Sequence, residues 1–308
     1  MTRVLFLYTV YYRLLILLTM FVSSTILACS GDDVCIEKSS WHLGVALGIG
    51  VKTNPLVGGN NIPLVILPDV AWYAEKAYFD NGELGYQWLD QAKFSVESYL
   101  QLDRESALFG VLHPANILSP TGSASDSFSP PPTLIDNEHD SAESILPTDS
   151  EIKAPSLSID EVASCKWAIN GGIRAHYYLS DGEWQLSLKQ DISNVHKGQQ
   201  VGLQYMHRWL WNTFRFTLRI GTDWKSARVI DYYYGVSQRD TDRKELFYNG
   251  KSGWQTYMAL NVQKPINENW SWLANIGYRR FPKSFTDSPL IAQNNIRNIF
   301  LGVAYRFK

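Results

Sequence analysis

The end of the chain, Asn298 to Phe307, alternates apolar side chains with small or polar ones. Successive side chains of a β-strand point to opposite faces. The apolar face therefore carries Ile299, Leu301, Val303, Tyr305 and Phe307. Such a face, ending in aromatic rings, is typical of the closing strand of an outer-membrane β-barrel, although a half-buried soluble strand can share it. We predict a lipid-facing closing strand whose assembly signal is Val303, Tyr305 and Phe307.

The same alternation recurs along most of the chain and predicts about twelve strands. They cover residues 41–52, 62–75, 77–89, 93–102, 167–179, 183–192, 201–206, 214–220, 229–236, 254–262, 270–279 and 298–307. The third strand is bent at Asp80 to Gly82, and the ninth, around Tyr232 to Tyr234, is the weakest. A single-chain bacterial barrel requires an even number of strands. The expected fold is therefore an all-β, antiparallel, up-and-down transmembrane barrel.

Composition fits a wall that faces lipid on one side and water on the other. The chain of 308 residues contains 11 Trp, 17 Tyr and 13 Phe, yet only 19% of its residues are charged and its mean hydropathy is −0.18. A search for apolar helices misses such a wall, because only alternate positions are apolar. The formal net charge of −2 gives no basic footprint for nucleic acid.

The faces opposite the apolar ones carry charges. A charge against lipid costs several kcal/mol near the midplane, so these side chains are expected to face the lumen. They are Lys52, Glu97, Arg174, His176, Lys189, Arg215, Arg219, Arg279 and Arg306. The basic excess suits an anion-preferring pore or a plugged interior held by ion pairs and water, and a barrel of this size favours the second. Glycines on the inner face of the first strand, such as Gly48, predict crowding by other side chains.

Residues 1–28 have the layout of a secretory signal peptide. Arg3 and Arg13 flank or precede an apolar run that ends at Val22, and small residues lead to Ala28. The run is shorter than the roughly 18 residues that a spanning helix needs, so cleavage near Ala28 is favoured over a membrane anchor. The mature chain, 29–308, is then expected in the outer membrane of a Gram-negative bacterium.

Three cysteines remain after such a cleavage: Cys29, Cys35 and Cys165. In an oxidising periplasm Cys29 and Cys35 can form a small disulfide loop, which leaves Cys165 free. Alternatively, the residues before Cys29 approach a lipobox and Cys29 carries lipid. The cysteines and histidines do not gather at ligand spacing, so neither a metal nor another cofactor is expected.

Residues 119–158 interrupt the strands with a stretch rich in Ser, Pro and acidic side chains. Such a stretch buries too little apolar surface to offset its ordering entropy, so it is predicted to be disordered, either as an insertion without a role or as a binding arm. A count of strands back from a closing strand that ends in the periplasm puts residues 104–165 in the periplasm. Long segments are unusual there. Either a strand is miscounted, near 80–82 or 232–234, or a periplasmic arm exists, and we expect the arm.

Several blocks resemble the MipA/OmpV family, the MltA-interacting proteins. They are Trp41 to Val45, Thr53 to Val57, Leu67 to Val70 with Tyr73, Phe79 to Tyr86, Lys166 to Ala168, Tyr234 to Ser237, Asp287 to Leu290 and Gly302 to Phe307. The resemblance spans most of the mature chain except the acidic insertion, and it implies an outer-membrane barrel. Members are described as scaffolds for a lytic transglycosylase and a penicillin-binding protein, as adhesin-like or as porin-like. The resemblance brings no catalytic motif.

Three classes of function follow. The favoured hypothesis is a non-enzymatic scaffold that links the outer membrane to peptidoglycan-remodelling enzymes, with outer-membrane lipid and the barrel-assembly machinery as further partners. A small-solute channel or an adhesin-like surface barrel is the alternative. A lipid-modifying enzyme is least favoured, because it needs a serine beside a histidine near one rim. Only His207 is placed for that role, and no adjacent strand offers it a serine.

Overall fold

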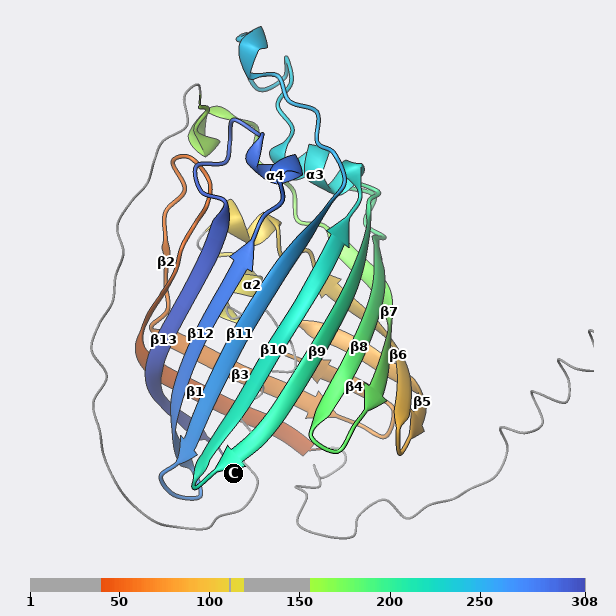
Figure 1. The fold of residues 1–308 in the computed structure, drawn as a ribbon, viewed down its shortest axis with the longest axis vertical. Helices are drawn as coiled ribbons and strands as arrows, with labels where there is room; N and C mark the ends of the chain where they lie inside the picture. Colours follow the sequence, from red (N-terminus) through yellow and green to blue (C-terminus); the bar gives the residue numbers. More distant parts are fainter. Residues whose placement is uncertain (1–39, 111, 119–155, 308) are drawn as a thin grey trace, which may run out of the picture. The chain divides into compact units, whose positions relative to one another are not determined.

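The computed structural model describes residues 40–110, 112–118 and 156–307, in which twelve antiparallel strands close into a β-barrel, as predicted (Figure 1). The strands are β1 (Ser40–Lys52), β3 (Ile66–Tyr73), β4 (Ala77–Asp80), β5 (Glu83–Gln91), β6 (Phe94–Leu102), β7 (Ile169–Tyr178), β8 (Gly182–Asp191), β9 (Gln199–Trp211), β10 (Phe214–Lys225), β11 (Gly253–Pro265), β12 (Trp270–Arg280) and β13 (Asn295–Arg306). A short strand, β2 (Ile62–Pro63), pairs with the end of β1. Among the described residues, no helix combines the length and apolar character needed to cross a membrane.

The barrel is closed by its first and last strands. β13 pairs with β1 from Asn298 opposite Lys52 to Arg306 opposite Gly44. The other strands follow one another around the sheet in chain order. Closure pairs the backbone N–H and C=O groups of both edges, which lipid could not satisfy in an open sheet.

The predicted alternation of the closing strand is present in β13. Ile299 and Leu301 are exposed on the outer surface of the barrel, whereas Phe300 and Ala304 are buried inside it. The same alternation holds on β12, where Ile276 is exposed and Asn275 is buried. Outward positions are therefore apolar and inward positions are free to be polar.

Small residues on the inner face of β1 leave room for a phenyl ring. Phe300 is 1% exposed and belongs to a cluster of buried apolar side chains inside the barrel. A Cβ atom added to Gly48 would lie 2.8 Å from the Phe300 ring and 2.6 Å from the Gly302 backbone. One side of the lumen, along β1 and β13, is thus filled by apolar groups.

Two strand assignments from the sequence were wrong. The predicted bent strand 77–89 is a hairpin of β4 and β5, and its turn residues Asn81 and Gly82 have φ values of 46° and 89°. Asn-Gly is the strongest short hairpin signal because both positions need positive φ. The predicted ninth strand is a helix, α3 (Ala227–Tyr234). The hairpin adds one strand to the predicted count and the helix removes one, so the predicted total of twelve was right although these two assignments were wrong.

The second of these errors changes the predicted topology, because α3 lies between the insertion and the C-terminus, from which the strands were counted, whereas the hairpin does not. Short turns at one end of the barrel join β3 to β4, β5 to β6, β7 to β8, β9 to β10 and β11 to β12. The connections 53–61, 192–198, 226–252 and 281–294 lie at the other end, and so do the described residues between β6 and β7, namely 103–110, 112–118 and 156–168. Residues 103–118 and 156–168, which flank the insertion, therefore lie at the same end as the loop 281–294 that was predicted to be outside. The strand count behind the expected periplasmic arm was therefore wrong by one, and residues 119–155 themselves lie outside the described residues.

The long connections carry the remaining secondary structure. Besides α3 it comprises η1 (Ser106–Leu108), α2 (Pro114–Ile117), η2 (Ile159–Glu161), η3 (Lys244–Leu246) and α4 (Lys283–Thr286). Figure 1 shows α3 and α4 at the long-loop end of the barrel and α2 near them, within the outline of the wall.

Candidate functional site

A segment that follows β6 runs inward and plugs the barrel at its long-loop end. We call residues 103–110 and 112–118, with η1 and α2, the plug segment. His113 caps α2: its Nδ1 accepts a hydrogen bond from the N–H of Ala115 at 3.1 Å, and Pro114 occupies the first helical position. A cap acceptor followed by proline is a favourable start for a helix. The plug segment is therefore locally encoded, although its position depends on contacts with the wall.

The first anchor of the plug segment is Asp103, which is 2% exposed. Its Oδ2 accepts hydrogen bonds from Asn170 of β7 at 2.7 Å and Gln200 of β9 at 2.8 Å. His196 Nε2 lies 3.4 Å away, and Oδ1 accepts from the N–H of Glu105 at 2.9 Å. Burial by itself would raise the pKa of Asp103, but the nearby His196 ring and the charges of two nearby lysines hold it well below its ordinary value.

The second anchor is Glu105, which ties the plug segment to the barrel wall and to α3. Its carboxylate accepts hydrogen bonds from the ammonium group of Lys225 at the end of β10 and from the hydroxyl of Tyr234. Burial opposes the charge, but Lys225 outweighs it, and the pKa of Glu105 is lowered. A carboxylate with a buried cation and a buried phenol is well satisfied.

The far end of the plug segment is fixed by asparagines. Asn116 accepts a hydrogen bond from Lys52 Nζ of β1 at 3.1 Å and donates to the carbonyls of Ala107 and Gly110. Asn54, in the loop after β1, donates to the carbonyl of Leu108 at 2.7 Å. The plug segment thus contacts β1, β7, β9 and β10, which lie on different sides of the barrel.

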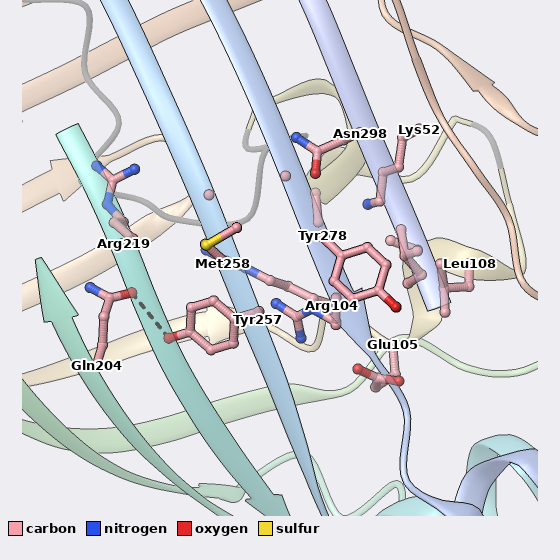
Figure 2. Close-up of a pocket in the computed structure, with 16 residues that line it drawn as sticks. Lys52, Arg104, Glu105, Leu108, Gln204, Arg219, Tyr257, Met258, Tyr278 and Asn298 are labelled. Carbon is pink, nitrogen blue, oxygen red and sulfur yellow. Dashed lines mark hydrogen bonds between the residues drawn. The ribbon is translucent and has the colours of Figure 1, made fainter. Parts of the chain in front are cut away.

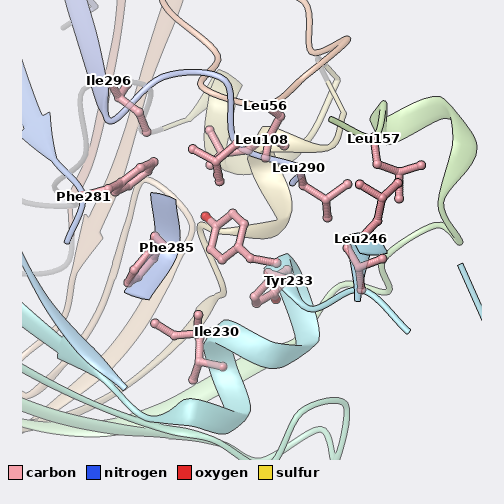
Figure 3. Packing of buried hydrophobic residues seen from close by; sticks show 14 residues of the cluster. Leu56, Leu108, Leu157, Ile230, Tyr233, Leu246, Phe281, Phe285, Leu290 and Ile296 are labelled. Atoms are coloured by element: carbon pink, nitrogen blue, oxygen red, sulfur yellow. The ribbon is translucent and has the colours of Figure 1, made fainter. Parts of the chain in front are cut away.

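Above the plug segment, the long connections pack into a hydrophobic cap. Figure 3 shows its side chains, which come from the plug segment, α3, α4 and the loops before and after them. The cap comprises Leu56, Leu108, Leu157, Val229, Ile230, Tyr233, Tyr234, Val236, Leu246, Phe281, Phe285, Leu290, Ile291 and Ile296. Ser288 Oγ donates to the carbonyl of Tyr234 at 2.6 Å and holds the α4 loop against α3. This apolar cluster of loop side chains covers the mouth of the barrel at its long-loop end.

Below the plug segment, an ion-pair network crosses the inner wall of β5 to β9. Arg174 donates to both oxygens of Glu83 at 2.7 Å and to Glu97 at 2.6 Å, and its guanidinium lies 4.0 Å from the centre of the Tyr99 ring. His176 contacts Glu97 and Glu183. Bidentate pairing with a second carboxylate is among the strongest arrangements for a buried arginine. The network lines a cavity of about 480 Å³ in the lumen.

A second, smaller cavity of about 80 Å³ lies between the plug segment and the opposite wall (Figure 2). Four cations from four elements line it: Lys52, Arg104, Arg219 and Arg279. Glu105 is the carboxylate among its lining side chains. The lumen is therefore basic along β1, β10 and β12 and rich in carboxylates along β5 to β8.

The residues predicted to face the lumen occupy three parts of it. Glu97, Arg174, His176 and Lys189 line the larger cavity, Lys52 and Arg219 line the smaller one, and Arg279 lines both. Arg215 lies on the same face of β10 as Arg219, and Arg306 on the same face of β13 as Ala304, near the short-turn end. Sequence reasoning missed Glu83, Asp103, Glu105 and Glu183. Glu83 was hidden by the misread hairpin, and Asp103 and Glu105 lie just beyond a strand.

The predicted assembly signal forms an aromatic cluster at the short-turn end. The Tyr305 ring lies 4.8 Å from that of Trp270 and 5.0 Å from that of Phe307, measured between centres.

Cys165 is a free thiol whose pKa is raised to about 11, chiefly by burial. Cys29 and Cys35, like the proposed signal peptide, lie outside the described residues.

One buried serine contacts a histidine, but its hydrogen bonds do not suit a nucleophile. His113 Nε2 lies 2.9 Å from Ser106 Oγ, and Ser106 Oγ donates to the carbonyl of Asp103 at 2.6 Å. Because His113 Nδ1 accepts from a backbone N–H, the neutral ring carries its proton on Nε2 and donates to the serine. A general base would have to accept that proton instead.

In the part of the chain that the structure describes, no group of three metal-ligating side chains converges.

Comparison with known proteins gives a consistent picture. A family profile described as MltA-interacting protein MipA matches residues 45–307. The outer membrane protein YiaT of Escherichia coli K12 is 28% identical over 137 residues, which are 44% of this chain and 56% of YiaT. The MltA-interacting protein of the same strain is 26% identical over 143 residues, 46% of this chain and 58% of that protein. The alignments with these curated relatives thus cover little more than half of their length. Among solved structures, the NanC porin aligns with a TM-score of 0.39 and 9% identity over 86% of this chain and 100% of that chain.

Proposed function

The chain belongs to the MltA-interacting protein MipA family of outer-membrane β-barrels, and we propose that it acts as a closed, non-enzymatic scaffold. Its proposed partners are peptidoglycan-remodelling enzymes, namely a lytic transglycosylase and a penicillin-binding protein. The observation that carries the proposal is the closed mouth: the plug segment and the hydrophobic cap obstruct the barrel at one end. A barrel with an obstructed lumen acts through its exposed surfaces, and we propose that these surfaces bind partner proteins.

Opening the mouth would be costly. Phe281, Phe285 and Tyr234 are among the large cap side chains that are almost fully buried. Exposing each such side chain to water costs on the order of 2 kcal/mol. The anchors at Asp103 and Glu105 would have to break as well. A spontaneous opening that displaces the whole cap is therefore rare, which supports a binding role over a transport role.

The partner class comes from the relatives. A relative is named for its interaction with MltA, and the family profile carries the same description. For this chain, the enzymes would bind at the periplasmic end, which long outer loops and short inner turns identify as the short-turn end. There the described residues offer the turns at Asn212 and Asn267.

Crosslinking tests the proposed scaffold. A photo-crosslinking residue at Asn212 or Asn267 should capture a purified lytic transglycosylase, whereas the same residue at Asn249, in the loop after α3, should not. Capture from Asn249 alone would refute the proposed periplasmic contact. Equal capture from all three positions would mean non-specific adhesion and would refute it too.

The larger cavity favours a second candidate, a small-solute channel. Its 480 Å³ and its charged lining would accommodate a hydrated solute if the plug segment moved. Conductance in a planar bilayer separates the two functions. The scaffold predicts a silent trace for the folded protein, and stable single-channel steps would favour the channel.

A further inference from the structure

Almost all ionised side chains in the described strands point into the lumen, and those that point outward are basic. Cross-strand partners share a face. Arg280 is opposite Asn295 and Arg297 is opposite Tyr278, which is 41% exposed on the outer surface. Lys264 is opposite Trp272, another exposed outward residue. The outward charges of the strands are thus Lys264 near the short-turn end and Arg280 with Arg297 at the long-loop end.

Arg280 and Arg297 form a pair on neighbouring strands. Their positions are diagonal in the ladder of β12 and β13. Diagonal neighbours in such a ladder are generally about 7–8 Å apart, with their Cβ atoms somewhat closer. Both side chains are exposed. Arg297 Nε donates to Asn295 Oδ1 at 3.1 Å, and this hydrogen bond uses neither of the two terminal nitrogens of the guanidinium. Two guanidinium groups at this spacing can converge on one phosphate.

Polar neighbours complete the site. Thr256 of β11 is opposite Arg280 on the side away from β13, and the Thr53 hydroxyl accepts from the N–H of Arg297 at 2.9 Å. Towards the middle of the barrel the same face turns apolar at Ile276 and Ile299, with Tyr278 at the boundary. The two arginines therefore stand just beyond the apolar band, at the level where lipid headgroups begin.

We propose that Arg280 and Arg297 bind a phosphate group of lipopolysaccharide in the outer leaflet. The long-loop end faces outward, because long connections lie outside and short turns in the periplasm. A phosphorylated glycolipid places anionic groups immediately above acyl chains, which matches cations immediately above Tyr278. Two basic side chains at a lipid surface strengthen binding about 30-fold. The site is independent of the proposed scaffold, since it lies on the lipid-facing wall at the opposite end.

The test measures lipopolysaccharide bound to detergent-extracted, folded protein by mass spectrometry of its hydroxylated fatty acids. The double variant Arg280→Gln, Arg297→Gln should retain about 30-fold less than the unchanged protein. Lys264→Gln is the matched control, because it removes an outward cation at the other end, and it should retain the full amount. Equal retention by the double variant, or an equal loss in the control, would overturn the proposal.

Refolded protein distinguishes phosphate recognition from other lipid contacts. Binding of lipopolysaccharide should fall when its phosphates are removed chemically, and the conservative double variant Arg280→Lys, Arg297→Lys should keep part of it. If dephosphorylated lipopolysaccharide or phosphatidylglycerol vesicles bind as well as intact lipopolysaccharide, the assignment is wrong. Heat-modifiable gel mobility shows that each variant is folded, and the two single substitutions replace the double variant if it is not.

Discussion

Replacing Asp103 with alanine should free the plug segment from the barrel wall. In the structure its carboxylate accepts from Asn170, Gln200 and the N–H of Glu105, all in a site that water barely reaches. Alanine removes the acceptor and leaves these three donors buried without it. The strands keep their ladder hydrogen bonds, so the damage is confined to the attachment of the plug segment.

The free-energy cost of Asp103→Ala follows from the buried donors that lose their acceptor. Each buried donor that loses its partner costs about 1–3 kcal/mol, and loss of the buried charge offsets part of the total, so we expect about 4 kcal/mol. Asp103→Asn should cost about half as much, because the side-chain amides of Asn170 and Gln200 can rotate to present their oxygens. The geometry therefore predicts that Asp103→Ala destabilises the attachment of the plug segment more than Asp103→Asn does.

Hydrogen exchange of the plug amides in the folded, detergent-solubilised barrel is the direct assay. At about 1.4 kcal/mol per tenfold, amides that open with the plug segment should exchange about a thousandfold faster in Asp103→Ala and about thirtyfold faster in Asp103→Asn. Amides of β12 serve as the internal control and should not change. Unchanged exchange in the plug segment, or equal acceleration in β12, would show that Asp103 does not anchor it.

Three further outcomes are expected. Arg174→Gln leaves Glu83 buried without its cation and should lower the free energy of unfolding by about 3–5 kcal/mol. Arg208→Gln, which changes a side chain that is 56% exposed, should lower it by less than about 1 kcal/mol, and urea titration in liposomes compares the two variants. Asp103 and Glu105 have lowered pKa values, so the stability that their carboxylates provide is present above the unfolded pKa of about 4 and is lost as the pH falls below that value. Exchange of the plug amides should therefore accelerate below about pH 4 but not between pH 8 and 6. Tyr305→Asp places a charge on the outward face beside aromatic rings and should reduce the heat-modifiable, folded form in outer-membrane fractions, and normal mobility would contradict the assigned lipid-facing role.

The strands could be predicted from the sequence because their information is local. The alternation around Leu301 and Ile276 needs no knowledge of partners, since lipid covers every outward position of the wall. Errors arose where a pattern was short. β4 has four residues, too few to show a period, and the aromatic run at Tyr232 to Tyr234 has strand-like composition although it lies in a helix.

The plug and cap could not be predicted in this way. Asp103 and Glu105 look like ordinary polar residues after a strand, and their importance depends on Asn170, Gln200 and Lys225, which lie far along the chain. Apolar loop residues of the cap have no period, because their burial is set by four connections that meet only in three dimensions. Reading Asn81 and Gly82 as a tight turn would have made the predicted number of strands odd, and the even number that a barrel requires would then have pointed to another misassigned strand.

The attachment of the plug segment also dictates the order in which the barrel is completed. Glu105 is bonded to Lys225 and Tyr234, which follow it by 120 and 129 residues. None of these bonds can form until the plug segment, β10 and α3 are all in place, so the interior is sealed only after strands on both sides of the insertion have assembled. The entropy of closing a chain segment grows only with the logarithm of its length, about 0.6 kcal/mol for each doubling. The length of the chain between β6 and β7 therefore adds little to the free-energy cost of that sealing step.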